Sequence, residues 1–106
     1  MNKLKYNIDI HQLYGTFVGK LDTRISQDFQ PVLELEIEKC QANNPDEKLK
    51  ICFDFEKVDF ITSTFIRICV ESVKKIGKEN FCVINTNPLI KKTLKIAGLD
   101  EELNVS

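Results

Sequence analysis

The chain has few of the residues that build catalytic or metal centres. It has a single histidine, and none of its four cysteines forms a C-x-x-C pair. We therefore predict no metal site, and we expect buried, reduced cysteines that act as small hydrophobic residues at Cys40, Cys52, Cys69 and Cys82. The sequence also lacks a glycine-rich phosphate loop and a paired nucleophile and base. It is therefore predicted not to be an enzyme and to bind no cofactor.

The sequence also lacks long apolar runs and an excess of one charge. No apolar segment approaches the roughly 20 residues that a bilayer span needs, and residues 1–9, MNKLKYNID, have no apolar signal-peptide core. The net charge is −1 at pH 7, which does not favour nucleic acid or an anionic membrane as a partner. The lysines at 91, 92 and 95 are interpreted as a solvated helix face. A cytoplasmic location is therefore expected.

The composition that remains is typical of one folded domain. Hydrophobic residues make up 42% and charged residues 29% of 106 residues, which predicts a single domain over 1–106 with one core. Residues 3–10 and 12–19 read as two strands that pair antiparallel around His11, itself interpreted as a surface turn residue. Gly19–Asp22 is expected to turn the chain.

The remainder alternates helices with strands. Helices are predicted over about 26–41 and over 63–76, and strands over 49–55 and 81–84. Pro31 favours a first helix that starts near Asp28 or has a loose first turn. The second helix has a predicted core stripe and a stop at Gly77; the stripe is Ile66, Cys69, Val70, Val73 and Ile76. This order predicts an α/β fold, with a small mixed, largely parallel sheet of about four strands and helices packed mainly on one face.

A third helix and a packed tail are expected after the last strand. Asn87 is predicted as an N-cap and Pro88 as the first helical residue. Residues of this helix and of the tail are expected to pack on the domain: Leu89, Ile90, Leu94, Ala97, Leu99, Leu103 and Val105.

Three consecutive hydroxyl residues, Thr62-Ser63-Thr64, lie where the long strand leads into the second helix. With Thr62 as the helix cap, Ile61 and Ile66 are placed to form a hydrophobic staple. The hydroxyls of Ser63 and Thr64 are then not needed for capping. Such clusters are capping residues more often than phosphorylation sites. The next residue, Phe65, either packs under the preceding loop or forms an apolar contact for a partner beside the hydroxyls.

The stretch from Ile51 to Leu103 resembles a STAS domain of the bacterial anti-sigma factor antagonist family. Members of this family read as an apolar strand, D-S-S-G-L, a helix, a short strand ending in N-x-x-P, a helix and G-L-D. The counterparts here are T-S-T-F-I at residues 62–66, N-T-N-P at 85–88 and G-L-D at 98–100. Upstream, G-K-L-D at 19–22 is similar to the family's G-x-L-D turn.

The resemblance implies a phosphorylation switch. In such antagonists the second serine is phosphorylated by a partner anti-sigma kinase, and only the unphosphorylated form binds that kinase. By position, Thr64 is the implied phosphoacceptor, Ser63 is the second choice, and the partner-binding residues are Ser63, Thr64, Phe65 and Arg67. The implied partners are an anti-sigma factor that is a serine/threonine kinase of the histidine-kinase-like ATPase type, and a phosphatase.

Two departures from the family pattern support an alternative. Thr62 replaces an aspartate and lacks its charge, and Phe65 places a large ring where the family has glycine. They favour a non-phosphorylated STAS scaffold or assembly domain of a bacterial signalling complex. A third hypothesis, a thiol phosphotransfer or redox protein, requires a solvent-accessible cysteine with a lowered pKa.

Overall fold

Four strands form one sheet in the order β1–β2–β3–β4 in the computed structural model, which describes residues 2–106. The strands are β1 (Lys3–Asn7), β2 (Gln12–Leu21), β3 (Lys50–Ile61) and β4 (Phe81–Ile84). β1 and β2 pair antiparallel, whereas β2–β3 and β3–β4 are parallel. The predicted mixed, largely parallel sheet is therefore confirmed.

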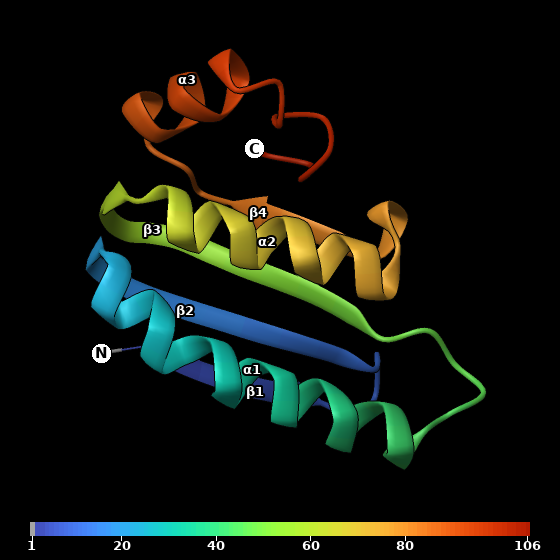
Figure 1. Ribbon diagram of the computed structural model, residues 1–106. Coiled ribbons are helices and arrows are strands. Elements are labelled where there is room, and N and C mark those ends of the chain that lie inside the picture. Colours follow the sequence, from blue (N-terminus) through green and yellow to red (C-terminus); the bar gives the residue numbers. More distant parts are fainter. Residues whose placement is uncertain (1) are drawn as a thin grey trace.

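Two helices connect the parallel strands. α1 (Thr23–Asn43) joins β2 to β3, and α2 (Ser63–Ile76) joins β3 to β4 through a short 3₁₀ turn, η1 (Lys78–Asn80). Figure 1 shows α1 and α2 on the same face of the sheet, with α3 (Pro88–Ile96) and the carboxyl-terminal tail beyond β4. Parallel neighbours need such crossovers, because the chain must return to the same end of the sheet before each new strand.

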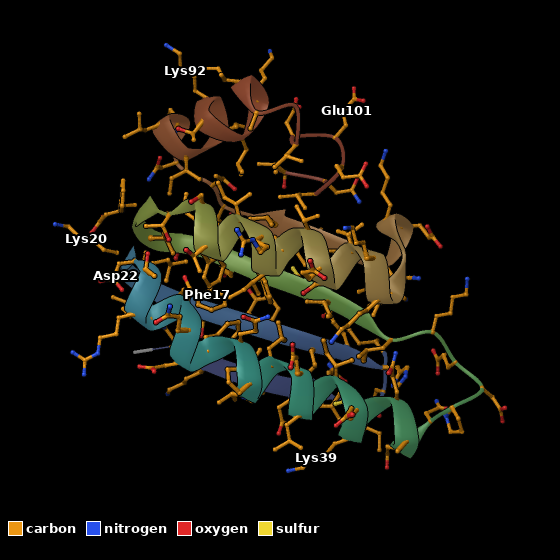
Figure 2. All side chains as sticks on the ribbon, viewed as in Figure 1. Phe17, Lys20, Asp22, Lys39, Lys92 and Glu101 are labelled. Atoms are coloured by element: carbon orange, nitrogen blue, oxygen red, sulfur yellow. The ribbon has the colours of Figure 1, made fainter. Side chains whose placement is uncertain are left out.

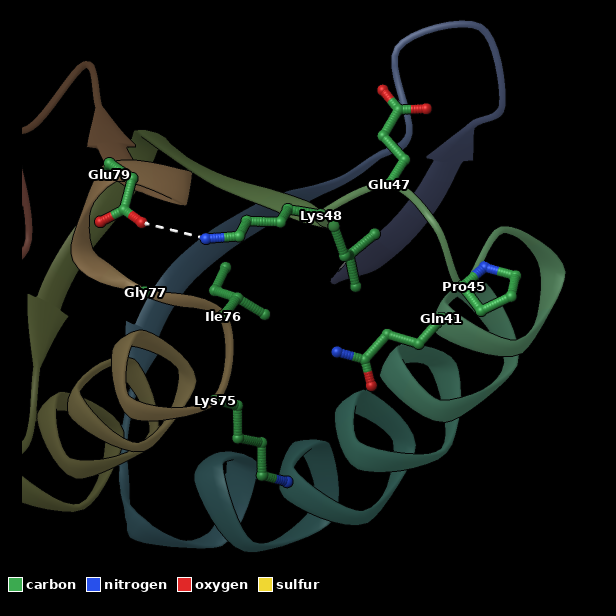
Figure 3. Close-up of a pocket in the computed structure, with 9 residues that line it drawn as sticks. Gln41, Pro45, Glu47, Lys48, Lys75, Ile76, Gly77 and Glu79 are labelled. Carbon is green, nitrogen blue, oxygen red and sulfur yellow. Dashed lines mark ion pairs between the residues drawn. The ribbon is translucent and has the colours of Figure 1, made fainter.

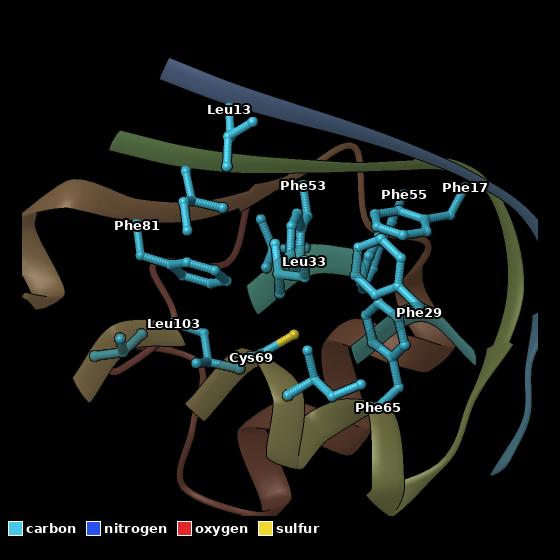
Figure 4. Close-up of a cluster of buried hydrophobic side chains, with 14 of the residues drawn as sticks. Leu13, Phe17, Phe29, Leu33, Phe53, Phe55, Phe65, Cys69, Phe81 and Leu103 are labelled. Atoms are coloured by element: carbon cyan, nitrogen blue, oxygen red, sulfur yellow. The ribbon is translucent and has the colours of Figure 1, made fainter. Parts of the chain in front are cut away.

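A cluster of phenylalanine rings fills the space between these helices and the sheet (Figure 4). Phe17 makes edge-to-face contacts whose ring centroids lie 5.1–5.8 Å apart, with Phe29, Phe53, Phe55 and Phe65. Gly15 of β2 makes room for the cluster, because a Cβ there would lie 3.0 Å from the rings of both Phe17 and Phe53. The strand therefore contains a glycine where two rings approach its backbone.

α1 starts earlier than predicted. The Asp22 carboxylate accepts a hydrogen bond of 2.9 Å from the backbone N–H of Ile25 and caps the helix. Pro31 lies inside the helix and is exposed, so it neither delays the start nor loosens the first turn. The prediction of a turn over Gly19–Asp22 is also wrong, because β2 continues to Leu21 and the chain turns only at Asp22 (Figure 2).

The β1–β2 hairpin is confirmed, but its details differ from the prediction. β1 ends at Asn7, and the side chains of Ile8 and Ile10 are 65% and 46% exposed. His11 is fully buried rather than at the surface, with a positive φ of 51°. Its Nδ1 and the Tyr6 hydroxyl are hydrogen-bonded at 2.5 Å. This bond and the return of the chain into β2 hold the imidazole inside.

The predicted bounds of α2 and β4 are confirmed, whereas β3 extends six residues beyond Phe55. The buried face of α2 is rotated from the predicted stripe, because it includes Phe65 and Ile68 while Ile66 and Val70 are half-buried. Apolar residues cover a broad side of this helix, from Ile68 through Phe65 to Val70, so their spacing alone did not determine which part of it is buried.

The end of the chain packs as expected in most respects. The Asn87 side chain caps α3 by accepting from the N–H of Ile90 at 2.8 Å. Leu103 is fully buried, and Val105 forms a parallel bridge with Val83 of β4. Two predicted inward residues of α3 are instead exposed, Leu89 and Ala97, because the short helix buries only one narrow stripe.

Candidate functional site

The hydroxyl cluster lies at the amino-terminal end of α2, where β3 ends. Thr62 is the single residue between the strand and the helix, and its extended backbone places it at the N-cap. Its carbonyl accepts the first helical hydrogen bond, from the N–H of Ile66 at 3.0 Å. The Thr62 hydroxyl does not cap the helix but donates to the Leu21 carbonyl at 2.9 Å. The prediction of Thr62 as the N-cap residue is therefore confirmed, but a cap by its hydroxyl is wrong, because this hydroxyl links the end of β2 to the start of α2.

The first turn of α2 presents two hydroxyls and contains no acidic residue of its own. Ser63 is exposed and Thr64 is half-buried. This turn has no acidic residue and its N-cap makes no side-chain hydrogen bond. The amino end of a helix carries a partial positive charge and N–H groups without intrahelical acceptors. The turn is therefore suited to receive negative charge. Arg67, one turn further along, is also exposed.

Phe65 is not part of this surface. The side chain is fully buried, and its ring lies 5.2 Å from that of Phe17 and stacks on that of Phe29 at 5.8 Å. Figure 4 shows it pointing from α2 toward the sheet. The expected partner contact by Phe65 is therefore wrong. The packing interpretation was right about burial, although the ring lies in the central core rather than under a loop.

Other elements begin or end beside the hydroxyls, at the end of the sheet where the parallel strands terminate. Figure 1 shows the amino ends of α1, α2 and α3 together there. The Asn87 amide donates to the Val58 carbonyl at 3.0 Å and ties the start of α3 to β3. Two large apolar side chains are exposed here, Phe60 at the end of β3, which is 48% exposed, and Leu89 at the start of α3, which is 65% exposed. The sequence analysis did not identify them. Phe60 lies in the half of β3 where Phe55, Val58 and Ile61 are the buried residues, so strict alternation did not mark it.

A hollow of about 490 Å³ lies at the opposite end of α1 and α2 (Figure 3). Lys48 and Glu79 form an exposed ion pair across part of it, with Nζ 3.8 Å from Oε1. Its lining contains no hydroxyl, thiol or imidazole group. Its ionisable groups are the exposed side chains of Glu47, Lys48, Lys75 and Glu79.

The sheet face opposite α1 and α2 carries a polar network around Asp54. The Tyr14 hydroxyl donates to Asp54 Oδ2 at 2.5 Å, and the Asn85 amide and the Glu56 N–H donate to Oδ1 at 3.1 and 3.0 Å. Burial acts to raise the pKa of Asp54, but these hydrogen bonds together outweigh it and hold that pKa below its usual value. The bond to Asp54, with burial and the nearby negative charge, raises the pKa of Tyr14 to about 12.

The four cysteines are all free thiols, in three kinds of surroundings. Cys40 and Cys69 lie in the core, where burial raises the pKa of each thiol. Cys52 is 5% exposed, as expected of a buried thiol. Cys82 differs from the expectation, because it is only half-buried. Within residues 2–106, no three His, Cys, Asp or Glu side chains come together as a metal site.

None of the helices in residues 2–106 has both the length and the apolar character that spanning a bilayer requires. No protein-family model matches the sequence, and no curated protein matches it either.

Several solved structures nevertheless have a fold similar to that of this chain. A STAS domain protein from Planctomyces limnophilus superposes with a TM-score of 0.76 at 19% identity, over 99% of this chain and 87% of its own. An anti-sigma factor antagonist from Mycobacterium paratuberculosis gives 0.70 at 20% identity, over 99% and 83%. The anti-sigma factor antagonist SpoIIAA in its unphosphorylated form gives 0.68 at 13% identity, over 91% and 83%. The chain therefore has the α/β fold of the STAS domain, as seen in these anti-sigma factor antagonists.

Proposed function

We propose that this protein is an anti-sigma factor antagonist, which binds its partner through the edge of the sheet where α2 begins. The observation that supports this most is the pair of hydroxyls, Ser63 and Thr64, in a first helical turn without acidic residues. The same edge exposes Phe60 and Leu89. A surface that combines apolar side chains with hydroxyls and free N–H groups is suited to bind another protein.

The proposed switch is phosphorylation of Thr64, with Ser63 as the second candidate acceptor. A phosphate adds about −1.5 to −2 charges at pH 7. At the amino end of a helix each such charge is favourable by about 0.3–1 kcal/mol when exposed. Phosphorylation should therefore leave the domain folded while it adds negative charge to the binding surface. Since Phe65 points into the core, its ring does not cover the hydroxyls or obstruct a kinase that approaches them.

The proposed partner is an anti-sigma factor that is also a serine/threonine kinase of the histidine-kinase-like ATPase type. It binds the unphosphorylated form near Ser63, Thr64 and Arg67, and a phosphatase restores that form. All of these partners are cytoplasmic in this proposal.

The test uses purified protein, a candidate anti-sigma kinase and ATP. Mass spectrometry should find one phosphate on the peptide that contains residues 63 and 64. Thr64→Ala should abolish it, whereas Thr93→Ala, at an exposed threonine of α3, should not. A phosphate that persists in Thr64→Ala and disappears in Ser63→Ala would transfer the acceptor role to Ser63. If the wild-type protein remains unmodified by every kinase that binds it, the switch is wrong.

Binding is measured separately by calorimetry with ADP-loaded kinase. Thr64→Glu should weaken binding by about tenfold or more, since a charge mismatch at an interface costs about a kcal/mol or more. Its circular dichroism spectrum should match that of the wild type. Thr93→Glu should bind like the wild type.

The alternative, a non-phosphorylated scaffold domain, is favoured by one observation. Thr62 replaces the family's aspartate, and its hydroxyl is used to hold β2 against α2. This alternative predicts a stable complex or self-association that Thr64→Glu hardly changes. A large loss of binding in that variant would exclude it.

A further inference from the structure

Two cysteines from different strands lie side by side on the sheet. Cys52 of β3 and Cys82 of β4 are directly opposite each other in the parallel register. Successive side chains of a strand point to opposite faces. Phe53 and Phe81 are core residues beneath α1 and α2, so both thiols project from the other face. There they continue a row across the sheet that begins with Lys5 and Tyr14.

The two thiols differ in accessibility and in ionisation. Cys52 is 5% exposed, whereas Cys82 is half-buried. The neighbouring Cys52 thiol lowers the pKa of Cys82 to about 7. The Cys82 sulfur, burial and the negative charge of Asp54 raise the pKa of Cys52. The more accessible sulfur therefore ionises more readily, whereas the inner one retains its proton. Reactive cysteines commonly combine an accessible thiolate with an adjacent second thiol.

We propose that Cys82 and Cys52 form a thiol–disulfide exchange site that takes small-molecule disulfides such as oxidised glutathione. The Cys82 thiolate attacks one glutathione sulfur, the S–S bond breaks, and one glutathione leaves as a thiolate and takes up a proton. Cys52 then loses its proton and attacks the Cys82 sulfur, which releases the second glutathione. The products are a Cys52–Cys82 disulfide and two reduced glutathione molecules, so two electrons pass from the protein to the reagent.

The backbone allows both steps. Neighbouring strands lie about 4.7–4.9 Å apart, which is within the usual range of about 4.4–6.8 Å between the Cα atoms of a disulfide. The site lies on the sheet face opposite α1 and α2, away from the hydroxyls of α2. This proposal therefore does not depend on the proposed antagonist function.

The first test follows the reaction with oxidised glutathione by intact-mass spectrometry and peptide mapping. The wild-type protein should pass through a glutathione adduct at Cys82 to a product that has lost two hydrogens, with Cys52 and Cys82 linked. Cys52→Ser should stop at the adduct, because no second thiol displaces glutathione. Cys82→Ser should form neither product. Cys40→Ala, which removes a core thiol outside the pair, should behave like the wild type.

The second test measures the alkylation rate of Cys82 by iodoacetamide against pH. A thiol of pKa about 7 is about half ionised at pH 7, whereas an ordinary thiol is about 3% ionised. Since its lower basicity also reduces its nucleophilicity, we expect a rate about threefold that of free cysteine at pH 7. In the wild type the midpoint should lie near pH 7, and in Cys52→Ala, which leaves no thiol or hydroxyl beside Cys82, it should move upward.

Three results would overturn the proposal. The first is an adduct that forms on Cys40 or Cys69 before Cys82. The second is a Cys52→Ser variant that reacts to the same end product as the wild type. The third is a wild-type alkylation midpoint near that of free cysteine. If Cys82→Ser does not fold, the pH profile of alkylation of the wild-type protein still tests the proposal.

Discussion

At the scale of single residues, Phe65 shows how a surface position can be used by the core. It follows the two candidate phosphoacceptor hydroxyls, yet its own side chain is fully buried among the rings of Phe17, Phe29, Phe53 and Phe55. The helix presents Ser63 and Thr64 to the outside while Phe65 anchors the same turn. Its role is therefore structural, and the hydroxyls depend on it for their position.

Phe65→Ala should destabilise the protein by roughly 3–5 kcal/mol, because it leaves a cavity among four other rings. Urea unfolding followed by circular dichroism measures the change. Phe60→Ala, at a ring that is 48% exposed on the neighbouring strand end, is the matched control and should cost less than about 1 kcal/mol. Equal losses in the two variants would contradict the buried position of Phe65.

Asp54 should make the stability of the protein depend on pH in the acid range. Its folded pKa is lowered, so the unfolded chain, with an ordinary pKa of about 3.9, binds a proton first as the pH falls. The carboxylate therefore contributes stability that is present above about pH 5 and is lost as the pH falls through the folded pKa.

Asp54→Asn tests this by urea unfolding at several pH values. The difference in free energy of unfolding between wild type and variant should be largest near pH 7 and should shrink on acidification. Asp59→Asn, at an exposed carboxylate of the same strand, is the control. A pH-independent difference for Asp54→Asn would refute the role of its hydrogen bonds with Tyr14 and Asn85. In Tyr14→Phe, the free energy of unfolding should fall less on acidification than it does in the wild type.

At the scale of elements, α1 shows that a strong cap and a buried stripe outweigh an unfavourable residue. Its cap at Asp22 and five buried residues determine a helix of 21 residues. Pro31 interrupts only one hydrogen bond, because its missing N–H leaves the Gln27 carbonyl without its helical partner. The exposed position of Pro31 keeps this loss out of the core.

Pro31→Ala should therefore stabilise the protein. Proline is about 3 kcal/mol less favourable than alanine inside a helix, and the stiffness that proline gives the unfolded chain offsets part of this. We expect a gain of about 1–2 kcal/mol, measured as a higher urea midpoint. Glu38→Ala, at another exposed site of α1, should change stability by less than about 0.5 kcal/mol. A lower urea midpoint for Pro31→Ala would contradict this and would mean that Pro31 stabilises the folded protein.

At the scale of the whole molecule, the three helices all begin at the same end of the sheet, where the parallel strands terminate. The hydroxyls of α2 lie there, the hollow of Figure 3 lies at the other end, and the thiol pair lies on the far face of the sheet. The tail closes the open side of β4, because Val105 bridges to Val83 and the Asn104 amide donates to the carbonyls of Lys78 and Phe81.

The tail should therefore contribute to the stability of the whole domain. Leu103 is fully buried in the main core, so Leu103→Ala should cost about 2–5 kcal/mol. The loss should appear as one cooperative transition shifted to lower urea, since the tail and the core share contacts. Glu101→Ala, at an exposed site of the same segment, should be close to neutral. A normal urea midpoint for Leu103→Ala would mean that the tail does not belong to the core.

The sequence by itself determined much of the order of the fold. The spacing of apolar residues and the punctuation by Gly77, Asn87 and Pro88 led to the correct bounds of α2 and β4 and to a capped α3. Alternating strands and helices predicted the mixed sheet, because crossovers leave few other arrangements. These features depend on neighbours along the chain, and local sequence records them directly. The phosphoacceptor role of Thr64 stays a prediction.

Only the tertiary structure decided which face of each element is buried and which side chains meet. α2 has apolar residues over a broad side, so only packing against the sheet showed that Phe65 and Ile68 point inward. The Thr62 hydroxyl bonds to Leu21, 41 residues away in the chain, and Cys52 meets Cys82 through strand register. Such contacts depend on how strands align in space, and no local pattern specifies that alignment.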